Sequence, residues 1–83
     1  MKKVILLFGN WSKESQEVKE FWLKMKKTKK FDLKIFDVST KEGADLMDRY
    51  EVSVIPVTII DGEIKFIGIP DIKTVEEIFD EEG

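Results

Sequence analysis

The chain has 83 residues, neither cysteine nor histidine, and a formal net charge of −3. This length suits one small domain, and the charge does not favour binding to nucleic acid or to an anionic membrane surface. Without histidine or cysteine, zinc sites built on these ligands, Ser-His hydrolases and cysteine proteases are excluded. The longest apolar run, Val4 to Phe8, is too short for a membrane span or a signal peptide. We therefore expect a cytoplasmic protein.

The first half of the chain predicts a strand, a long helix and a second strand. The continuous apolar run from Val4 to Phe8 is typical of a strand covered on both faces. Residues 31 to 38 alternate between apolar and polar side chains, which indicates the second strand. Between them, a helix is expected from about Ser12 to Lys27, because four apolar residues recur on one face at the helical period: Val18, Phe21, Trp22 and Met25.

The second half predicts a short helix, a hairpin and a last helix. Ser39 or Thr40 can cap the short helix, which runs through Arg49. Residues 57–60 and 63–67 are two strands around Asp61-Gly62, a strong signal for a hairpin turn. Asp71 can cap the last helix, which ends at about Asp80, and the acidic end, 80–82, is expected to be frayed. The partial core contacts expected from the two helices are Ala44, Leu46, Met47 and Tyr50, then Ile72, Val75, Ile78 and Phe79.

The predicted order of elements is βαβαββα in a single α/β domain spanning residues 1–83. A helix joins the first two strands, so these strands should be parallel with a right-handed crossover. The last two strands should form an antiparallel hairpin. The sequence contains no linker, no repeat and no low-complexity segment.

Two stretches of sequence carry a resemblance to a known family. "NWSKES" follows the first strand, and "SVIPVTIIDGEIKFIG" follows the second helix. This order and spacing resemble the thioredoxin/glutaredoxin superfamily over essentially the whole chain, and most of all the small archaeal-type thioredoxins. The resemblance implies a thioredoxin fold, with a four-stranded mixed sheet flanked by helices. It further implies a role in thiol–disulfide exchange, electron transport and cell redox homeostasis.

The resemblance also assigns roles to individual residues. The family has Trp-Cys-x-x-Cys after the first strand, so Ser12 and Ser15 occupy the positions of the nucleophilic and the resolving cysteine. The other residues implied are a cis proline and substrate contacts, namely Trp11, Ile55, Pro56, Ile67 and Gly68. Ile69 would complete an apolar rim, unless the isoleucines pack under the last helix. The buried acid that many thioredoxins place six residues before the first cysteine aligns with Leu6.

Serine keeps the shape of cysteine without its chemistry. A hydroxyl forms no disulfide and does not ionise usefully near neutral pH, and the chain has no histidine to act as its base. The chain as written is therefore expected to lack thiol–disulfide activity. Residue physics alone favours a second interpretation of Ser12, because serine is a preferred N-cap. Both interpretations can hold together.

Three accounts of the serines remain open. The first is a Cys→Ser replacement in a redox protein whose surrounding site is intact. The second is a natural, redox-inactive module that binds extended peptides or a partner protein. The third is an idealised scaffold, which has little reason to keep Trp11 or the Ile55-Pro56 step. In the parent family the partners are disulfide-containing proteins and a reductase or glutathione. We expect a monomer with no metal and no cofactor.

Overall fold

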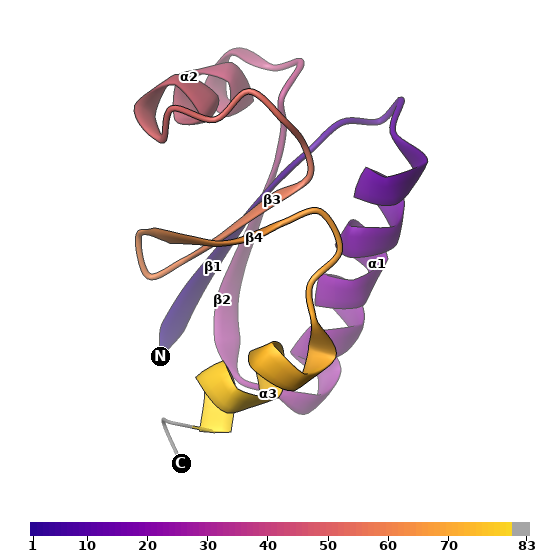
Figure 1. Ribbon diagram of the computed structural model, residues 1–83, viewed down its shortest axis with the longest axis vertical. Helices are drawn as coiled ribbons and strands as arrows, with labels where there is room; N and C mark the ends of the chain where they lie inside the picture. Colours follow the sequence, from indigo (N-terminus) through magenta and orange to yellow (C-terminus); the bar gives the residue numbers. More distant parts are fainter. Residues whose placement is uncertain (81–83) are drawn as a thin grey trace.

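The computed structural model describes residues 1–80, and the expectation for the acidic end from residue 81 onward lies outside them. Within these residues the elements follow the predicted order (Figure 1). They are β1 (Lys2–Phe8), α1 (Lys13–Thr28), β2 (Phe31–Asp37), α2 (Lys41–Arg49), β3 (Val57–Ile60), β4 (Glu63–Ile67) and α3 (Ile72–Asp80).

The four strands form one mixed sheet in the order β2-β1-β3-β4. β1 pairs with β2 in parallel and with β3 in antiparallel orientation, and β3 and β4 form the antiparallel hairpin. Asp61 and Gly62 turn that hairpin with φ values of +50° and +84°, the left-handed backbone that a two-residue hairpin loop requires. The predicted α/β class and four-stranded mixed sheet are confirmed.

Helices cover both faces of the sheet. α1 and α3 pack on one face, where Trp22 and the rings of Phe31 and Phe79 meet edge-on or tilted at centroid distances of 5.1 to 6.3 Å. α2 packs on the other face over Leu7 and Val57. Figure 1 shows α2 and α3 at opposite ends of the molecule, with α1 running alongside the sheet between them. Across residues 1–80, no helix combines the length and apolarity that crossing a bilayer demands.

Capping residues fix where the first two helices begin. Ser12 is the N-cap of α1, and its Oγ accepts a hydrogen bond from the amide of Ser15. Of the two candidates for α2, Thr40 is the N-cap, and its Oγ1 accepts from the amide of Gly43. Ser39 lies one residue before this cap, and its amide and hydroxyl both donate to the side chain of Asp37.

The structure corrects several expectations in detail. β1 begins at Lys2 instead of residue 4, because the amide of Lys3 donates to Asp61 at the start of the hairpin turn. β2 ends at Asp37, one residue earlier than expected. Ala44 and Ile72 are exposed and make no core contact, although both were expected to. Ala44 lies on the outer side of α2, and Ile72 lies on the surface at the first turn of α3.

Candidate functional site

The candidate site begins at the N-terminus of α1, where Ser12 takes the N-cap position. Its backbone is extended, with φ −101° and ψ 118°, and its Oγ lies 3.1 Å from the amide nitrogen of Ser15. The amide of Ser12 donates to the carbonyl of Gly9, which closes the loop after β1. Free amides and the positive end of the helix dipole meet here, so a group with negative charge at position 12 would be stabilised.

Ser15 has a different environment from Ser12, although both are serines in one helical turn. Its side chain is fully buried, with 0% exposure, and its Oγ has no hydrogen-bond partner within residues 1–80. An unpaired buried hydroxyl costs about 1–3 kcal/mol. The space at position 15 therefore suits an apolar or weakly polar group better than a hydroxyl.

Gly9 brings two of the predicted contact residues together. A Cβ built on Gly9 would lie 2.5 Å from Cδ1 of Ile55 and 2.7 Å from Cζ2 of Trp11. Both distances are shorter than a real Cβ contact, so a side chain at position 9 would displace the ends of the Ile55 and Trp11 side chains. The Trp11 ring itself stays 68% exposed. The sequence analysis did not identify Gly9 as a site residue, and the only signal for it is a glycine two residues before the tryptophan.

Pro56 and Gly68 form the opposite wall of the candidate site. The peptide bond between Ile55 and Pro56 is cis, and Pro56 is buried. The carbonyl of Pro56 accepts a hydrogen bond from the amide of Gly68 at 2.8 Å, which joins the start of β3 to the end of β4. Gly68 has φ +88°, a conformation that strongly favours glycine. Ile67 is exposed by 65% beside it, and the same rim also exposes Val54 and Ile69.

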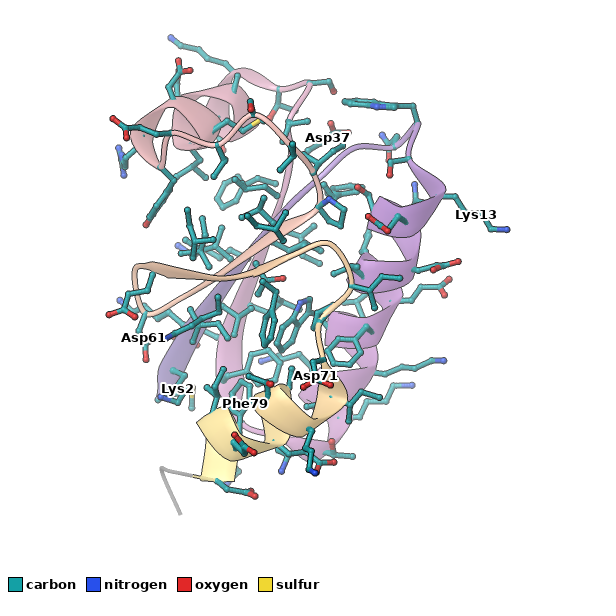
Figure 2. The ribbon with its side chains drawn as sticks, in the orientation of Figure 1. Lys2, Lys13, Asp37, Asp61, Asp71 and Phe79 are labelled. Carbon is teal, nitrogen blue, oxygen red and sulfur yellow. The ribbon has the colours of Figure 1, made fainter. Side chains whose placement is uncertain are left out.

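The two charged residues between the serines have different environments. Lys13 points away from the body of the molecule into solvent (Figure 2). Glu14 is also exposed but reaches toward the Gly68 loop, because its Oε1 lies 3.7 Å from the position that a Cβ on Gly68 would take. The first turn of α1 and the Gly68 loop are thus close neighbours, with a carboxylate between them.

A polar network holds the loop before α1 against the end of β2. Nδ2 of Asn10 donates to Oδ2 of Asp37 at 2.8 Å, and Nε2 of Gln16 donates to the carbonyl of Asn10 at 3.3 Å. The amide and hydroxyl of Ser39 also donate to Asp37, and they hold the pKa of its carboxyl below the usual value. The sequence analysis did not predict this network, because Asn10 and Asp37 lie 27 positions apart and belong to different elements.

The interior beneath the site is apolar. Leu6 is fully buried at the position that aligns with the family's buried acid. Thr58 pairs with Leu6 across the sheet, and its Oγ1 accepts a hydrogen bond of 3.0 Å from Nε1 of Trp22. Among residues 1–80, Ser15 and Thr58 are the only buried polar side chains. No buried titratable group within this range is placed to move a proton to or from position 12 or 15.

Taken together, the structure brings the predicted site residues to one end of the sheet. Ser12 and Ser15 lie at the start of α1, Trp11 and Ile55 both lie beside Gly9, and Pro56 bonds to Gly68. Ile67, at the end of β4, stands opposite Val57 in the ladder next to Pro56. The exposed positions of Ile67 and Ile69 exclude the alternative that these isoleucines pack under the last helix.

Comparison with protein families identifies the class to which this fold and site belong. A family model described as a thioredoxin domain matches residues 3–80. The chain therefore belongs to the thioredoxin family, and the resemblance noted in its sequence is confirmed. A search of curated proteins finds no match.

Solved structures agree on the fold. The chain is similar to a mutant thioredoxin from Halobacterium salinarum, with a TM-score of 0.78 and 17% identity over 96% of this chain and 73% of that one. It is similar to reduced thioredoxin from Schistosoma mansoni, with a TM-score of 0.76, 19% identity and coverage of 96% and 77%. The chain is also similar to mitochondrial thioredoxin 3 from Saccharomyces cerevisiae, with a TM-score of 0.74 and 20% identity over 96% of this chain and 77% of that one. At these identities the comparisons establish the thioredoxin fold.

The family performs thiol–disulfide exchange, and its members generally act on disulfide-containing substrates and are served by reductases. This chain carries the fold of the family without any cysteine.

Proposed function

We propose that the chain is a thiol–disulfide exchange protein in a redox-inactive form, with Ser12 and Ser15 at the positions of the nucleophilic and resolving cysteines. The observation that supports this most is the buried, unpaired Oγ of Ser15. A thiol is among the most buried polar groups in proteins and behaves as a small apolar side chain, so it would fill the same space without the cost of an unpaired hydroxyl.

The proposed chemistry of the cysteine form needs two thiols one helical turn apart. A thiolate at position 12, stabilised by the N-terminus of α1, attacks one sulfur of the substrate disulfide and releases the other as a thiolate. The thiol at position 15 loses its proton and attacks the mixed disulfide. This step releases the reduced substrate and leaves a disulfide between positions 12 and 15, which a reductase or glutathione then reduces.

In this proposal the apolar rim binds the substrate. Trp11 and Ile67 are both exposed. Ile55 and Trp11 lie beside Gly9, and Pro56 bonds to Gly68, the residue after Ile67. An extended peptide laid across this rim can use the backbone at Ile55 for hydrogen bonds and the apolar side chains for contact. The charge of Glu14 adds an acidic group at the same place.

The remaining parts of the proposal follow from the family. The partners are disulfide-containing proteins and an electron donor, the role is electron transport, and the location is the cytoplasm. The whole rim is built from one chain, so a monomer suffices for this function.

The first prediction tests whether the site around the serines is intact. Combining Ser12→Cys with Ser15→Cys should produce a protein that reduces insulin disulfides with dithiothreitol as the final reductant, because only the two sulfurs are missing. The rate of insulin precipitation, followed by turbidity, measures this activity. The unchanged chain and the Ser15→Cys single variant serve as controls and should not exceed the rate with dithiothreitol alone.

A correctly folded double variant that shows no rate above these controls would contradict the proposal. Far-ultraviolet circular dichroism and urea unfolding establish that the variant is folded. Formation of a disulfide between positions 12 and 15, counted by loss of free thiols, shows that the two side chains meet.

One observation favours a second function. The rim exposes Trp11, Val54, Ile67 and Ile69 even though the serines provide no redox chemistry, and exposed apolar clusters of this kind mark binding sites. The chain as it stands could therefore hold extended peptides. Binding that quenches or shifts Trp11 fluorescence in the unchanged chain, combined with no activity in the double cysteine variant, would favour this second function over the first.

A further inference from the structure

β2 is an edge of the sheet, and its outer side has no strand partner among residues 1–80. The amide of Val38 donates to the carbonyl of Phe8 in β1. Because the amide and carbonyl of one strand residue point to the same neighbour, the even-numbered residues of β2 bond to β1. The amides and carbonyls of Phe31, Leu33, Ile35 and Asp37 therefore point outward. An edge of this kind is a template for pairing with another strand.

The side chains of β2 divide between the two faces of the sheet. Leu33 and Ile35 are half-buried on the face covered by α1. Asp32 and Lys34 are exposed on the opposite face, where they line a shallow hollow together with Lys3 and Ile5. Neither Asp32 nor Lys34 has an ion-pair partner within the described part of the chain. These two opposite charges stand two positions apart on an open edge.

The outward backbone groups limit how two copies of β2 can pair. In an antiparallel pair related by a two-fold axis, the numbers of two residues that face each other always add up to the same sum. The residues that exchange hydrogen bonds must both point outward and are therefore both odd-numbered, so this sum is even. A sum of 64 places Asp32 against Asp32, and a sum of 68 places Lys34 against Lys34. A sum of 66 places Leu33 on the two-fold axis, Asp32 opposite Lys34 of the second copy, and Phe31 opposite Ile35 of the second copy.

α1 offers a second apolar contact beside this edge. Lys19 lines a hollow together with Ile35 and Asp37, and Lys26 lies over the ring of Phe31, so this flank of α1 faces β2. Leu23 lies between them in the helical row and is 46% exposed. A second copy paired on β2 would bring its own α1 next to this flank. The side chain of Leu23 would then become buried between the two copies.

We propose that two copies of this chain associate through their β2 edges in the register that faces Asp32 with Lys34, giving one continuous eight-stranded sheet. This inference departs from the monomer expected from the sequence. It does not depend on the proposed redox function, because no residue of the apolar rim belongs to β2 or to the α1 flank. The association is weak and reversible, since Lys26 bonds to the carbonyl of Phe31 and must release it before that carbonyl can pair.

Charge reversal tests both the interface and its register. Asp32→Lys and Lys34→Asp each create two like-charge pairs, and we expect each variant to dimerise about tenfold more weakly than the unchanged chain. An equimolar mixture of the two variants faces Lys with Asp at every pair and should form a heterodimer. The double variant restores the pairs in exchanged positions and should dimerise like the unchanged chain. Sedimentation velocity from about 20 µM to about 1 mM measures these equilibria.

Two matched variants control for total charge. Glu77→Lys and Lys73→Asp make the same charge changes on exposed positions of α3. Singly or mixed, they should leave dimerisation as it is in the unchanged chain. An unchanged chain that remains monomeric over the whole concentration range overturns the proposal. So does a mixture of Asp32→Lys and Lys34→Asp that associates no better than either variant alone.

Amide hydrogen exchange detects strand pairing directly, and changes in charge alone would not alter it. The outward amides of Leu33 and Ile35 should become about tenfold or more protected at high protein concentration, because they donate to the second copy in this register. Circular dichroism confirms that each variant is folded. Association without protection at these two amides would show that the copies meet elsewhere and would also overturn the proposal.

Discussion

Ser12 and Ser15 illustrate how one residue type takes opposite energetic roles within a single helical turn. The hydroxyl of Ser12 satisfies an amide that α1 leaves open, so it stabilises the helix. The hydroxyl of Ser15 is buried without a partner and so opposes folding. A change to alanine therefore has opposite expected effects at the two positions.

We expect Ser15→Ala to raise the free energy of unfolding by about 1 kcal/mol, because it removes an unpaired buried hydroxyl and improves helix propensity. Ser12→Ala should lower it by about 1 kcal/mol through the loss of the cap. Urea unfolding measures both changes, and each variant is the natural control for the other. A loss of stability in Ser15→Ala comparable to that in Ser12→Ala would mean that the hydroxyl of Ser15 is satisfied after all.

The sequence identified the principal site residues but not the residues that hold them in place. Trp11, the serines and Pro56 could be placed because their spacing matches a family pattern. Gly9 could not, because its importance arises only when Ile55, 46 positions further along the chain, lies beside it together with Trp11. Asn10 and Asp37 were missed for the same reason, since a hydrogen bond between distant loops leaves no periodic signal.

At the scale of elements, the hydrogen bond between Trp22 and Thr58 joins α1 to β3. Both side chains are fully buried, and the indole Nε1 has this one acceptor at 3.0 Å. The bond fixes how α1 lies on the sheet, and α1 in turn carries the serines to the site. Removing the acceptor would leave a buried donor unpaired.

Thr58→Val is expected to lower the free energy of unfolding by about 1–3 kcal/mol, because valine matches threonine in shape and cannot accept the indole hydrogen bond. Thr58→Ser keeps an acceptor and should cost less. Urea unfolding of both variants, together with Trp22→Phe in a double-mutant cycle, isolates the bond. Additive effects of Thr58→Val and Trp22→Phe would contradict the importance given to it.

The elements themselves were largely predictable, because each long periodic pattern coincides with a real helix or strand. The details in which the structure differs from the prediction depend on tertiary contacts. Lys2 and Lys3 join β1 only because Asp61 and β2 lie beside them, and their own side chains give no strand signal. Ala44 and Ile72 fit their helical patterns but lie where the sheet does not reach. The cap of α2 could be narrowed to two residues in the sequence, and the structure identifies Thr40 as the N-cap.

At the scale of the whole molecule, three aspartate carboxylates link stability to pH. The amide of Ser39 lowers the pKa of Asp37, the amide of Lys3 lowers that of Asp61, and the hydroxyl of Thr74 lowers that of Asp71. All three pKa values fall below 3.8, the value for an unperturbed aspartate. A carboxyl with a lowered pKa in the folded state contributes stability above its unfolded pKa, and this contribution disappears as the pH falls through the folded value.

We therefore expect these three carboxylates to leave the free energy of unfolding nearly constant between about pH 7 and pH 5. At pH values below about 4, the free energy of unfolding should decrease. Asp61→Asn should reduce the size of this fall, because asparagine does not titrate. Urea unfolding over a series of pH values gives the slope, and Asp45→Asn, an exposed change on α2, is the control. An equal slope in Asp61→Asn and the unchanged chain would show that Asp61 does not contribute.

The overall architecture could be predicted from the sequence more fully than the site. The order βαβαββα leaves few ways to arrange four strands, since neighbouring strands joined through a helix are expected to be parallel and a two-residue turn favours a hairpin. The order of the strands across the sheet was not predicted from the sequence and comes from the structure. The position of β2 at an open edge, with Asp32 and Lys34 exposed beside outward backbone groups, became visible only once the register was known.

The direction of β1 has a practical consequence. The strand starts at Lys2 and ends at Phe8, next to Gly9 and Trp11, so it covers a length of about 20 Å between the start of the chain and the rim. Figure 1 shows the N-terminus at the end of the molecule opposite α2, on the side where α3 lies. A tether attached ahead of Lys2 would hold the protein on a sensor surface with Trp11 facing the solution. Immobilised in this way, the chain could report peptide capture without steric interference from its support.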